Sequence, residues 1–164
     1  MSVFRKVACA ALILAVTAAC SGSGPKADPA VKRDFVHYLS QLAQVTDMES
    51  EALAAHVKAT EDPSINDAAY GRFLANTFIP KLEAFYGELQ RIHPTTEQII
   101  GLHKILLRRT TLMIAGFSDL EKSARTGDNA LIESARAKNA ESDILFKRWK
   151  EQLDELDRRY SKSN

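Results

Sequence analysis

Apolar residues recur every three or four positions along most of the chain after residue 28, a spacing typical of amphipathic α-helices. In the clearest stripe, Ile99, Leu106, Met113 and Leu120 follow one another at intervals of seven residues. Comparable stripes comprise Phe35, Leu39, Leu42, Val45 and Leu53; Phe78, Leu82, Phe85, Leu89 and Ile92; and Leu131, Ala135, Leu145, Trp149, Leu153 and Leu156. No segment is a candidate strand, so the pattern predicts an all-α domain.

Residues that favour helix ends divide this pattern into four predicted helices, over about 29–60, 65–92, 95–125 and 128–160. Asp28 is expected to cap the first helix, with Pro29 at its first position. Thr95 and Gln98 have the spacing of a capping box for the third. Gly127 and Asp128 are expected to end the third helix and cap the fourth.

The connections between these helices are only a few residues long, which makes successive helices antiparallel neighbours. We therefore expect a four-helix up-down-up-down antiparallel bundle. Pro80 lies inside the second helix, where it has no N–H to donate to the Asn76 carbonyl and crowds that group. The second helix is expected to be kinked at Pro80, by more than about 20°.

Charged residues interrupt two of the apolar stripes. Extending the stripes by sevens brings Glu49 and Lys138 to similar heights, together with Asn76 and Gly116, if the first and fourth helices are neighbours. A buried charge is costly unless it is paired, so an ion pair between Glu49 and Lys138 is one expectation. The alternative is that both side chains extend to water from the edge of the stripe.

The first two dozen residues differ in composition from the rest of the chain. Basic Arg5 and Lys6 precede an apolar run from Val7 to Val16, and Thr17-Ala18-Ala19 precedes Cys20. A basic region, an apolar region and small residues before a cleavage point form a secretory signal. Small residues followed by Cys resemble the lipobox of bacterial lipoproteins, although Thr17 stands where that family usually has Leu.

The resemblance implies that signal peptidase II cleaves before Cys20 and that lipid is attached to its sulfur. The corresponding organisation is a signal peptide over 1–19, a lipidated Cys and flexible tether over 20–27, and the bundle domain over 28–164. Two alternatives remain: simple secretion after a Thr17-x-Ala19 site, and an uncleaved anchor. The 13 apolar or small residues of 7–19 are fewer than the ~20 that a spanning helix needs.

Charge and cysteine content narrow the possibilities further. Cleavage before Cys20 leaves 145 residues with 20 Lys and Arg against 21 Asp and Glu, since the removed segment contains two basic residues and no acidic one. This near balance argues against a nucleic-acid partner, which requires a basic face. Cys9 leaves with the signal segment, so the exported domain has no pair of thiols for a disulfide and depends on its packed core.

Candidate chemistry is sparse. His37, His93 and His103 fall near the tether end of the bundle and are the candidates for a zinc or copper site. No HxxxH or ExxH pair places two such ligands on one helical face, which favours a surface His37, a His93 in the turn and a half-buried His103. Haem has no CxxCH motif, and Met48 and Met113 have no evident partner as axial ligands, so Met113 is expected in the core.

Aromatic residues of the second and third helices offer one more candidate. Phe73, Phe78, Phe85, Tyr86 and Phe117 could line an apolar pocket opened by the kink, or could simply fill the core. No nucleophile, base and orienting group form a catalytic motif. The site prediction is therefore lipidation at Cys20, with no catalytic, metal-binding or cofactor-binding residues.

These observations predict a non-catalytic, lipid-anchored protein of the bacterial cell envelope. The leading function is a structural or interaction module for a protein partner, with the membrane bound through the N-terminal lipid. Ser21 after the lipidated Cys implies the outer membrane, facing the periplasm, in a cell that has one. The alternative function is a small-ligand or metal-binding bundle. A binder should contain a polar-lined cavity, and a scaffold should have a solid core and exposed apolar side chains.

Overall fold

A computed structural model of the chain describes residues 28–161, and all of its elements are helical. The expected all-α class is confirmed for this part of the chain. The signal segment and Cys20 lie outside the described residues. The elements, in chain order, are α1 (Pro29–Glu61), α2 (Asp67–Phe73), the π-helical turn η1 (Leu74–Phe78), α3 (Ile79–Leu89), α4 (Glu97–Thr126) and α5 (Asn129–Ser161).

Three of the expected helix caps are confirmed. The Asp28 side chain accepts a hydrogen bond of 2.8 Å from the Ala30 N–H at the start of α1. Gly127 ends α4 with a φ of 73°, a left-handed conformation that glycine adopts without strain. Asp128 accepts a bond of 2.9 Å from the Ala130 N–H at the start of α5. These local signals fix both ends of the α4–α5 connection.

The capping box predicted at Thr95 and Gln98 is wrong. Thr96 is the N-cap of α4, and its own side chain does not cap the helix. The buried carboxylate of Asp34, from α1, accepts instead from the Thr95 N–H (3.0 Å), the Thr96 N–H (2.7 Å) and the Thr96 hydroxyl (2.6 Å). In a capping box the Gln98 side chain would accept from the Thr95 N–H. The Asp34 carboxylate, a stronger acceptor than an amide oxygen, takes this N–H instead, and so holds the two residues that precede α4.

The segment predicted as one helix over 65–92 is shorter and composite. It begins at Asp67, after the N-cap Asn66, and ends at Leu89. Its middle is the π-helical turn η1, in which the Ile79 N–H bonds the Leu74 carbonyl, five residues back. Pro80 lies two residues after the end of this turn. The wider turn changes the hydrogen-bond register just before a residue that has no N–H to donate.

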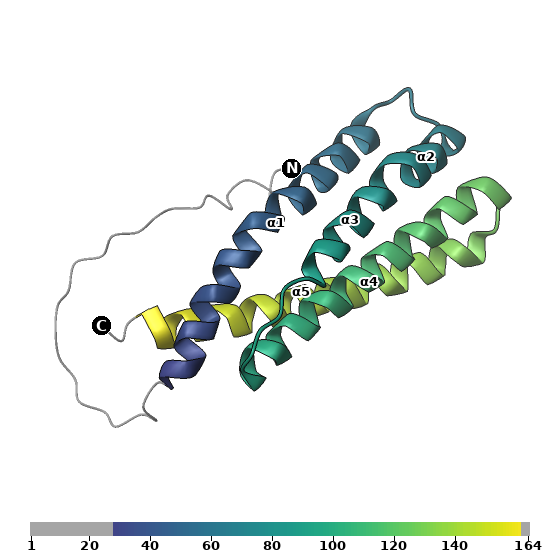
Figure 1. Cartoon of the computed structure of the whole chain (residues 1–164). Coiled ribbons are helices and arrows are strands. Elements are labelled where there is room, and N and C mark those ends of the chain that lie inside the picture. Colours follow the sequence, from purple (N-terminus) through teal and green to yellow (C-terminus); the bar gives the residue numbers. More distant parts are fainter. Residues whose placement is uncertain (1–27, 162–164) are drawn as a thin grey trace.

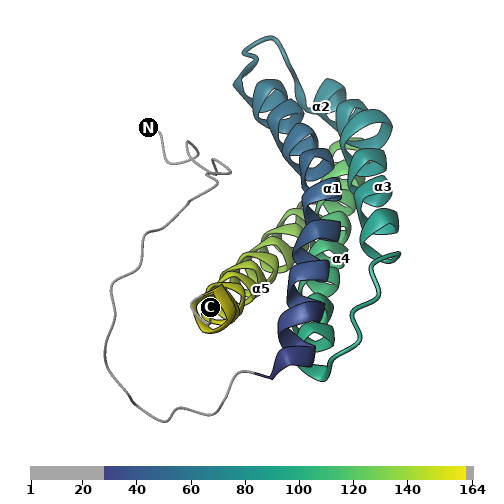
Figure 2. The same cartoon turned by 60° about the vertical axis from the view of Figure 1, so that its left-hand side comes forward.

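The helices do not pack evenly around one axis. In Figures 1 and 2, α1, the α2–α3 segment and α4 lie side by side, while α5 follows α4 and then diverges from it. α5 packs far more extensively on α4 than any other pair of helices packs, and α1 packs chiefly on α3 and then on α4. Backbone packing between α1 and α5 is minimal within residues 28–161, so side chains bridge these two helices.

Buried apolar side chains form two core clusters. The first lies toward the tether end and contains Val31, Phe35, Tyr38, Leu42, Val45, Phe85, Leu89, Ile92, Ile99, Leu102, Leu106 and Tyr160. The second contains Ala52, Leu74, Phe78, Leu82 and Met113. Each fully buried large apolar side chain contributes about 1.5–3 kcal/mol. All five stripe residues expected on the second helix, from Phe78 to Ile92, are buried as predicted.

Candidate functional site

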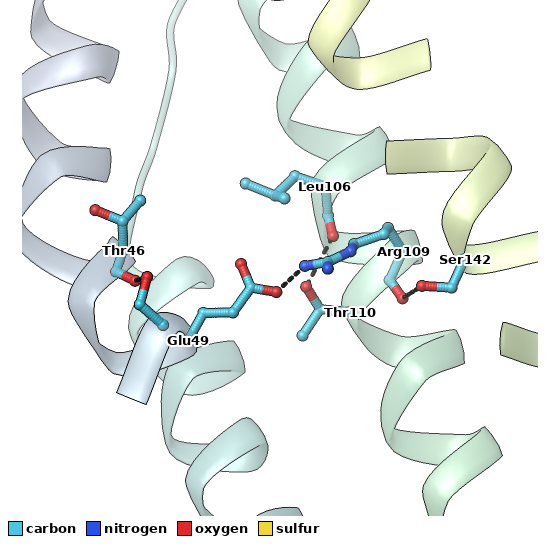
Figure 3. Close-up of polar contacts among 7 residues, drawn as sticks. Thr46, Glu49, Leu106, Arg109, Thr110 and Ser142 are labelled. Atoms are coloured by element: carbon cyan, nitrogen blue, oxygen red, sulfur yellow. Dashed lines mark hydrogen bonds and ion pairs between the residues drawn. The ribbon is translucent and has the colours of Figure 1, made fainter. Parts of the chain in front are cut away.

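A row of polar and aromatic side chains runs between α1, α4 and α5. It consists of Tyr38 and Glu49 from α1, Arg109 from α4, and Phe146 and Trp149 from α5; we call these five residues the α1–α5 seam. Glu49 reaches across to Arg109 and forms an ion pair with its guanidinium (Figure 3). The Phe146 ring lies 4.8 Å from the Arg109 guanidinium carbon and stacks on Trp149 at 5.9 Å. The seam therefore joins three helices by charge and by aromatic contact.

Arg109 is buried because of its position on α4. It follows Leu106 by three residues, on the same apolar stripe, and its side chain is 9% exposed. A buried guanidinium requires a partner, and the Glu49 carboxylate, itself 15% exposed, provides it. The Ser142 hydroxyl of α5 donates to the Arg109 carbonyl at 3.2 Å, which fastens α5 to α4 beside the ion pair (Figure 3).

The expected ion pair between Glu49 and Lys138 is wrong, because each charge has a different partner. Glu49 pairs with Arg109, and Lys138 pairs with Asp119 of α4, which also accepts a hydrogen bond of 2.7 Å from the Ser134 hydroxyl. The hydrogen bond from Lys138 holds the pKa of Asp119 below its usual value, against the opposing effect of burial. Because α5 packs on α4 rather than on α1, Lys138 lies within reach of α4 instead.

Several buried polar atoms of this region have no hydrogen-bond partner among the described residues. They are the Tyr38 hydroxyl and Trp149 Nε1, which lie near each other outside hydrogen-bonding geometry, and Gln41 Oε1, Arg109 Nε, Asn139 Oδ1 and both ring nitrogens of His103. Tyr38 is fully buried, and burial raises its pKa to about 12, with the Trp149 indole acting in the opposite direction. Each such atom costs free energy unless it is bonded, so their concentration here is unusual.

The three histidines expected near the tether end do not form a metal site. His37 and His93 are exposed, whereas His103 is 5% exposed and packs edge-on against the Tyr38 ring at 5.6 Å. Burial lowers the pKa of His103, the Leu89 backbone opposes this, and His93 adds to it. His103 is thus more deeply buried than the sequence indicated. No group of three or more His, Cys, Asp or Glu side chains within 28–161 is placed to bind a metal ion.

The methionines considered as haem ligands lie among apolar side chains. Met113 is buried in the second core cluster, as predicted, and Met48 packs against the first.

Four of the five aromatic residues considered as a pocket belong to the two core clusters or pack against them; the fifth, the half-buried Tyr86, does neither. Phe78 and Phe117 pack on the His56 ring, with ring centroids at 4.7 and 5.0 Å, and Phe73 stacks on Phe78. The His56 ring nitrogen Nε2 shares a hydrogen bond of 2.8 Å with the Tyr70 hydroxyl, and burial lowers the pKa of His56. These rings contact one another, as the core-filling alternative predicts. Phe85 belongs to the first cluster.

A few large apolar side chains remain exposed on the surface. They are Val36 and Val57 on α1, which are 58% and 48% exposed, and Ile144 and Phe146 on α5, which are 65% and 38% exposed. No helix in the described part of the chain is long and apolar enough to cross a bilayer.

No model of a known protein family matches the chain, and no curated protein or solved structure is significantly similar to it.

Proposed function

We propose that this chain is a lipid-anchored protein of the bacterial cell envelope whose helical domain is a non-catalytic structural or interaction module. The anchor rests on the sequence before residue 28: a signal peptide over 1–19, lipid on Cys20 and a tether over 20–27. In a cell with an outer membrane, Ser21 directs the protein to that membrane, facing the periplasm. Its partners are the membrane, through the lipid, and a protein of the envelope; nucleic acid is not among them.

The observation that favours an interaction module is the contrast between the core and α5. The core is filled by side chains that are fully buried, such as Phe78 and Leu82. α5, by contrast, exposes Ile144 and Phe146 to solvent. A solid interior leaves the surface as the place for function, and Ile144, the most exposed large apolar side chain of the described residues, is the candidate contact.

The same proposal includes an up-down-up-down course of the four helical segments, with a bend near Pro80. The successive packing of α1 on α3, of α3 on α4 and of α4 on α5 supports this course. The π-helical turn beside Pro80 supports the bend, because π-turns and prolines are both frequent causes of helix kinks.

Site-specific photo-crosslinking tests the interaction module. A benzoylphenylalanine at position 144 of the lipidated protein, in its own cells, should give a discrete crosslinked protein. The same probe at Val57, an exposed apolar residue of α1, is the matched control. Equal crosslinking from both positions, or none from either, would contradict the assignment to α5. Mass spectrometry of the native protein should also find diacylglycerol on Cys20; a free thiol there would refute the anchor.

One observation favours the second candidate function, a small-ligand-binding bundle. The α1–α5 seam contains a buried cation and several buried polar atoms without partners among the described residues. Such groups are characteristic of binding sites, where a ligand satisfies them.

A further inference from the structure

The unpartnered groups of the α1–α5 seam are mostly hydrogen-bond donors. Arg109 Nε and Trp149 Nε1 can only donate, whereas the Tyr38 hydroxyl, which lies near Trp149, can both donate and accept. The acceptors of this region are the Glu49 carboxylate, which is already paired with Arg109, and Gln41 Oε1, which has no partner among the described residues. A buried guanidinium whose Nε–H has no partner favours an anionic acceptor, which satisfies charge and hydrogen bonds together.

The walls of the seam favour an anion with an apolar body. Phe146 and Trp149 lie nearly parallel, at an interplanar angle of 17°, and Phe146 also contacts the guanidinium of Arg109. Phe146 is 38% exposed, so the seam reaches the surface at this ring. An aromatic or aliphatic group placed along these rings would bring an attached carboxylate toward Arg109.

The α1 side of the seam is the side that can open. On the α4–α5 side, packing is tight: a Cβ built on Gly116 would lie 2.4 Å from Asn139 Oδ1, and Ser142 is bonded to the Arg109 carbonyl. On the α1 side, Glu49 reaches Arg109 as a side chain, and the backbones of α1 and α5 hardly pack. Glu49 can therefore rotate away from Arg109 without separating packed helices.

We propose that the α1–α5 seam is a binding site for an organic carboxylate with an apolar or aromatic body, and that Glu49 occupies the carboxylate position in the unliganded protein. This inference rests on the second candidate function, ligand binding, and names its ligand class. A ligand displaces Glu49, pairs with Arg109 and lies along Phe146 and Trp149. Free organic acids and the C-terminal carboxylate of a protein share this chemistry.

The chain provides its own reporter for this site. Trp149 is its single tryptophan, so a change in intrinsic fluorescence reports the seam. The full-length mature protein is titrated with 3-phenylpropionate and, as a neutral control, with 3-phenylpropionamide. The expected result is a saturable change in fluorescence with the carboxylate and none with the amide.

Four variants make the test specific. Glu49→Gln removes the competing carboxylate and should tighten binding of 3-phenylpropionate by about tenfold or more, the equivalent of about 1.4 kcal/mol. Arg109→Gln should abolish binding, and Arg109→Lys, which keeps the charge, should weaken it. Arg108→Gln is the matched control, because Arg108 is the neighbouring residue but is 59% exposed and pairs with Glu141; it should bind like the wild type.

Circular dichroism establishes that each variant is folded, and Glu49→Gln tests the site even if Arg109→Gln does not fold. An equal response to the amide, or no tightening in Glu49→Gln, would overturn the proposal.

A peptide ending in Phe, with a free or an amidated C-terminus, separates the two sources of the carboxylate. If the free form binds more tightly than 3-phenylpropionate, the ligand is a protein C-terminus; if it binds more weakly, the ligand is a free organic acid. Crosslinking from position 144 tests the interaction module separately, so a failure of ligand binding and a failure of the interaction module can be told apart.

Discussion

Asp34 provides the sharpest test of how the tether end of the domain is held together. Its carboxylate, on a residue that is 7% exposed, binds the two residues that precede α4. Replacing it with alanine leaves the N–H groups of Thr95 and Thr96 and the Thr96 hydroxyl without their acceptor. Each hydrogen bond to a charged group contributes about 1.5–3 kcal/mol.

These contributions share one acceptor and are not additive, so we expect Asp34→Ala to lower the free energy of unfolding by about 3 kcal/mol. Asp34→Asn should cost about half as much, since one amide oxygen remains as an acceptor. Urea unfolding at pH 7, followed by circular dichroism, measures both. The matched control is Asp62→Asn: Asp62 accepts similar bonds from Ser64 in an exposed turn, where water replaces them, and its effect should be far smaller.

The pH dependence gives an independent check on Asp34. Burial alone would raise its pKa, but the hydrogen bonds from Thr96 and Thr95 outweigh burial and hold the pKa below the usual 3.8. The ionised form is therefore favoured by folding. Its contribution is complete above the unfolded pKa and is lost as the pH falls through the lower, folded pKa. The stability gap between wild type and Asp34→Asn should shrink below about pH 3.8.

Two results would refute this reasoning. One is an Asp34→Ala variant within about 0.5 kcal/mol of the wild type at pH 7, the range typical of surface substitutions without structural consequence. The other is a gap between wild type and Asp34→Asn that stays constant from pH 7 to pH 3.

Two further predictions concern α4 packing and the second core cluster. Gly116→Ala should destabilise the protein by about 1–3 kcal/mol, because the added Cβ would overlap Asn139; Gly101→Ala, where nothing lies within 4 Å, should be neutral or stabilising in the same thermal unfolding assay. Comparable melting temperatures would contradict the close α4–α5 approach. Tyr70→Phe removes the hydrogen bond to His56 and should cost about 1 kcal/mol. Burial lowers the pKa of His56, so folding favours its neutral form. The contribution of neutral His56 to the free energy of unfolding should be complete above the usual pKa of 6.5 and should decline as the pH falls below it. If the protein instead becomes more stable on acidification through this range, and a His56 variant does not, the predicted sign is wrong.

The sequence predicted correctly those features that depend only on residues close together in the chain. The caps at Asp28 and Asp128 and the left-handed Gly127 involve residues close in the chain, and all three were predicted. The apolar stripes likewise located the buried faces, because helical periodicity depends on the same neighbours. The capping box at Thr95 was wrong because Asp34, 61 residues away in the chain, provides a stronger acceptor.

The ion pairs could not be predicted, because they depend on which helices are neighbours. Glu49 was identified as a charge on an apolar stripe, but its partner was taken to be on the fourth helix. Arg109 had the same signal, since it interrupts the stripe between Leu106 and Met113. The observed uneven packing, with α5 on α4, then decides which charges meet. The π-helical turn has no sequence signature besides Pro80.

The most direct test of the central claim, that α5 presents an interaction surface, is quantitative affinity capture from the envelope with Ile144→Asp and Val57→Asp. Both residues are exposed apolar side chains, 65% and 48% exposed, so neither change should affect the core. We expect Ile144→Asp to fail to capture a protein that the wild type and Val57→Asp both capture. Identical captured proteins from all three would contradict it.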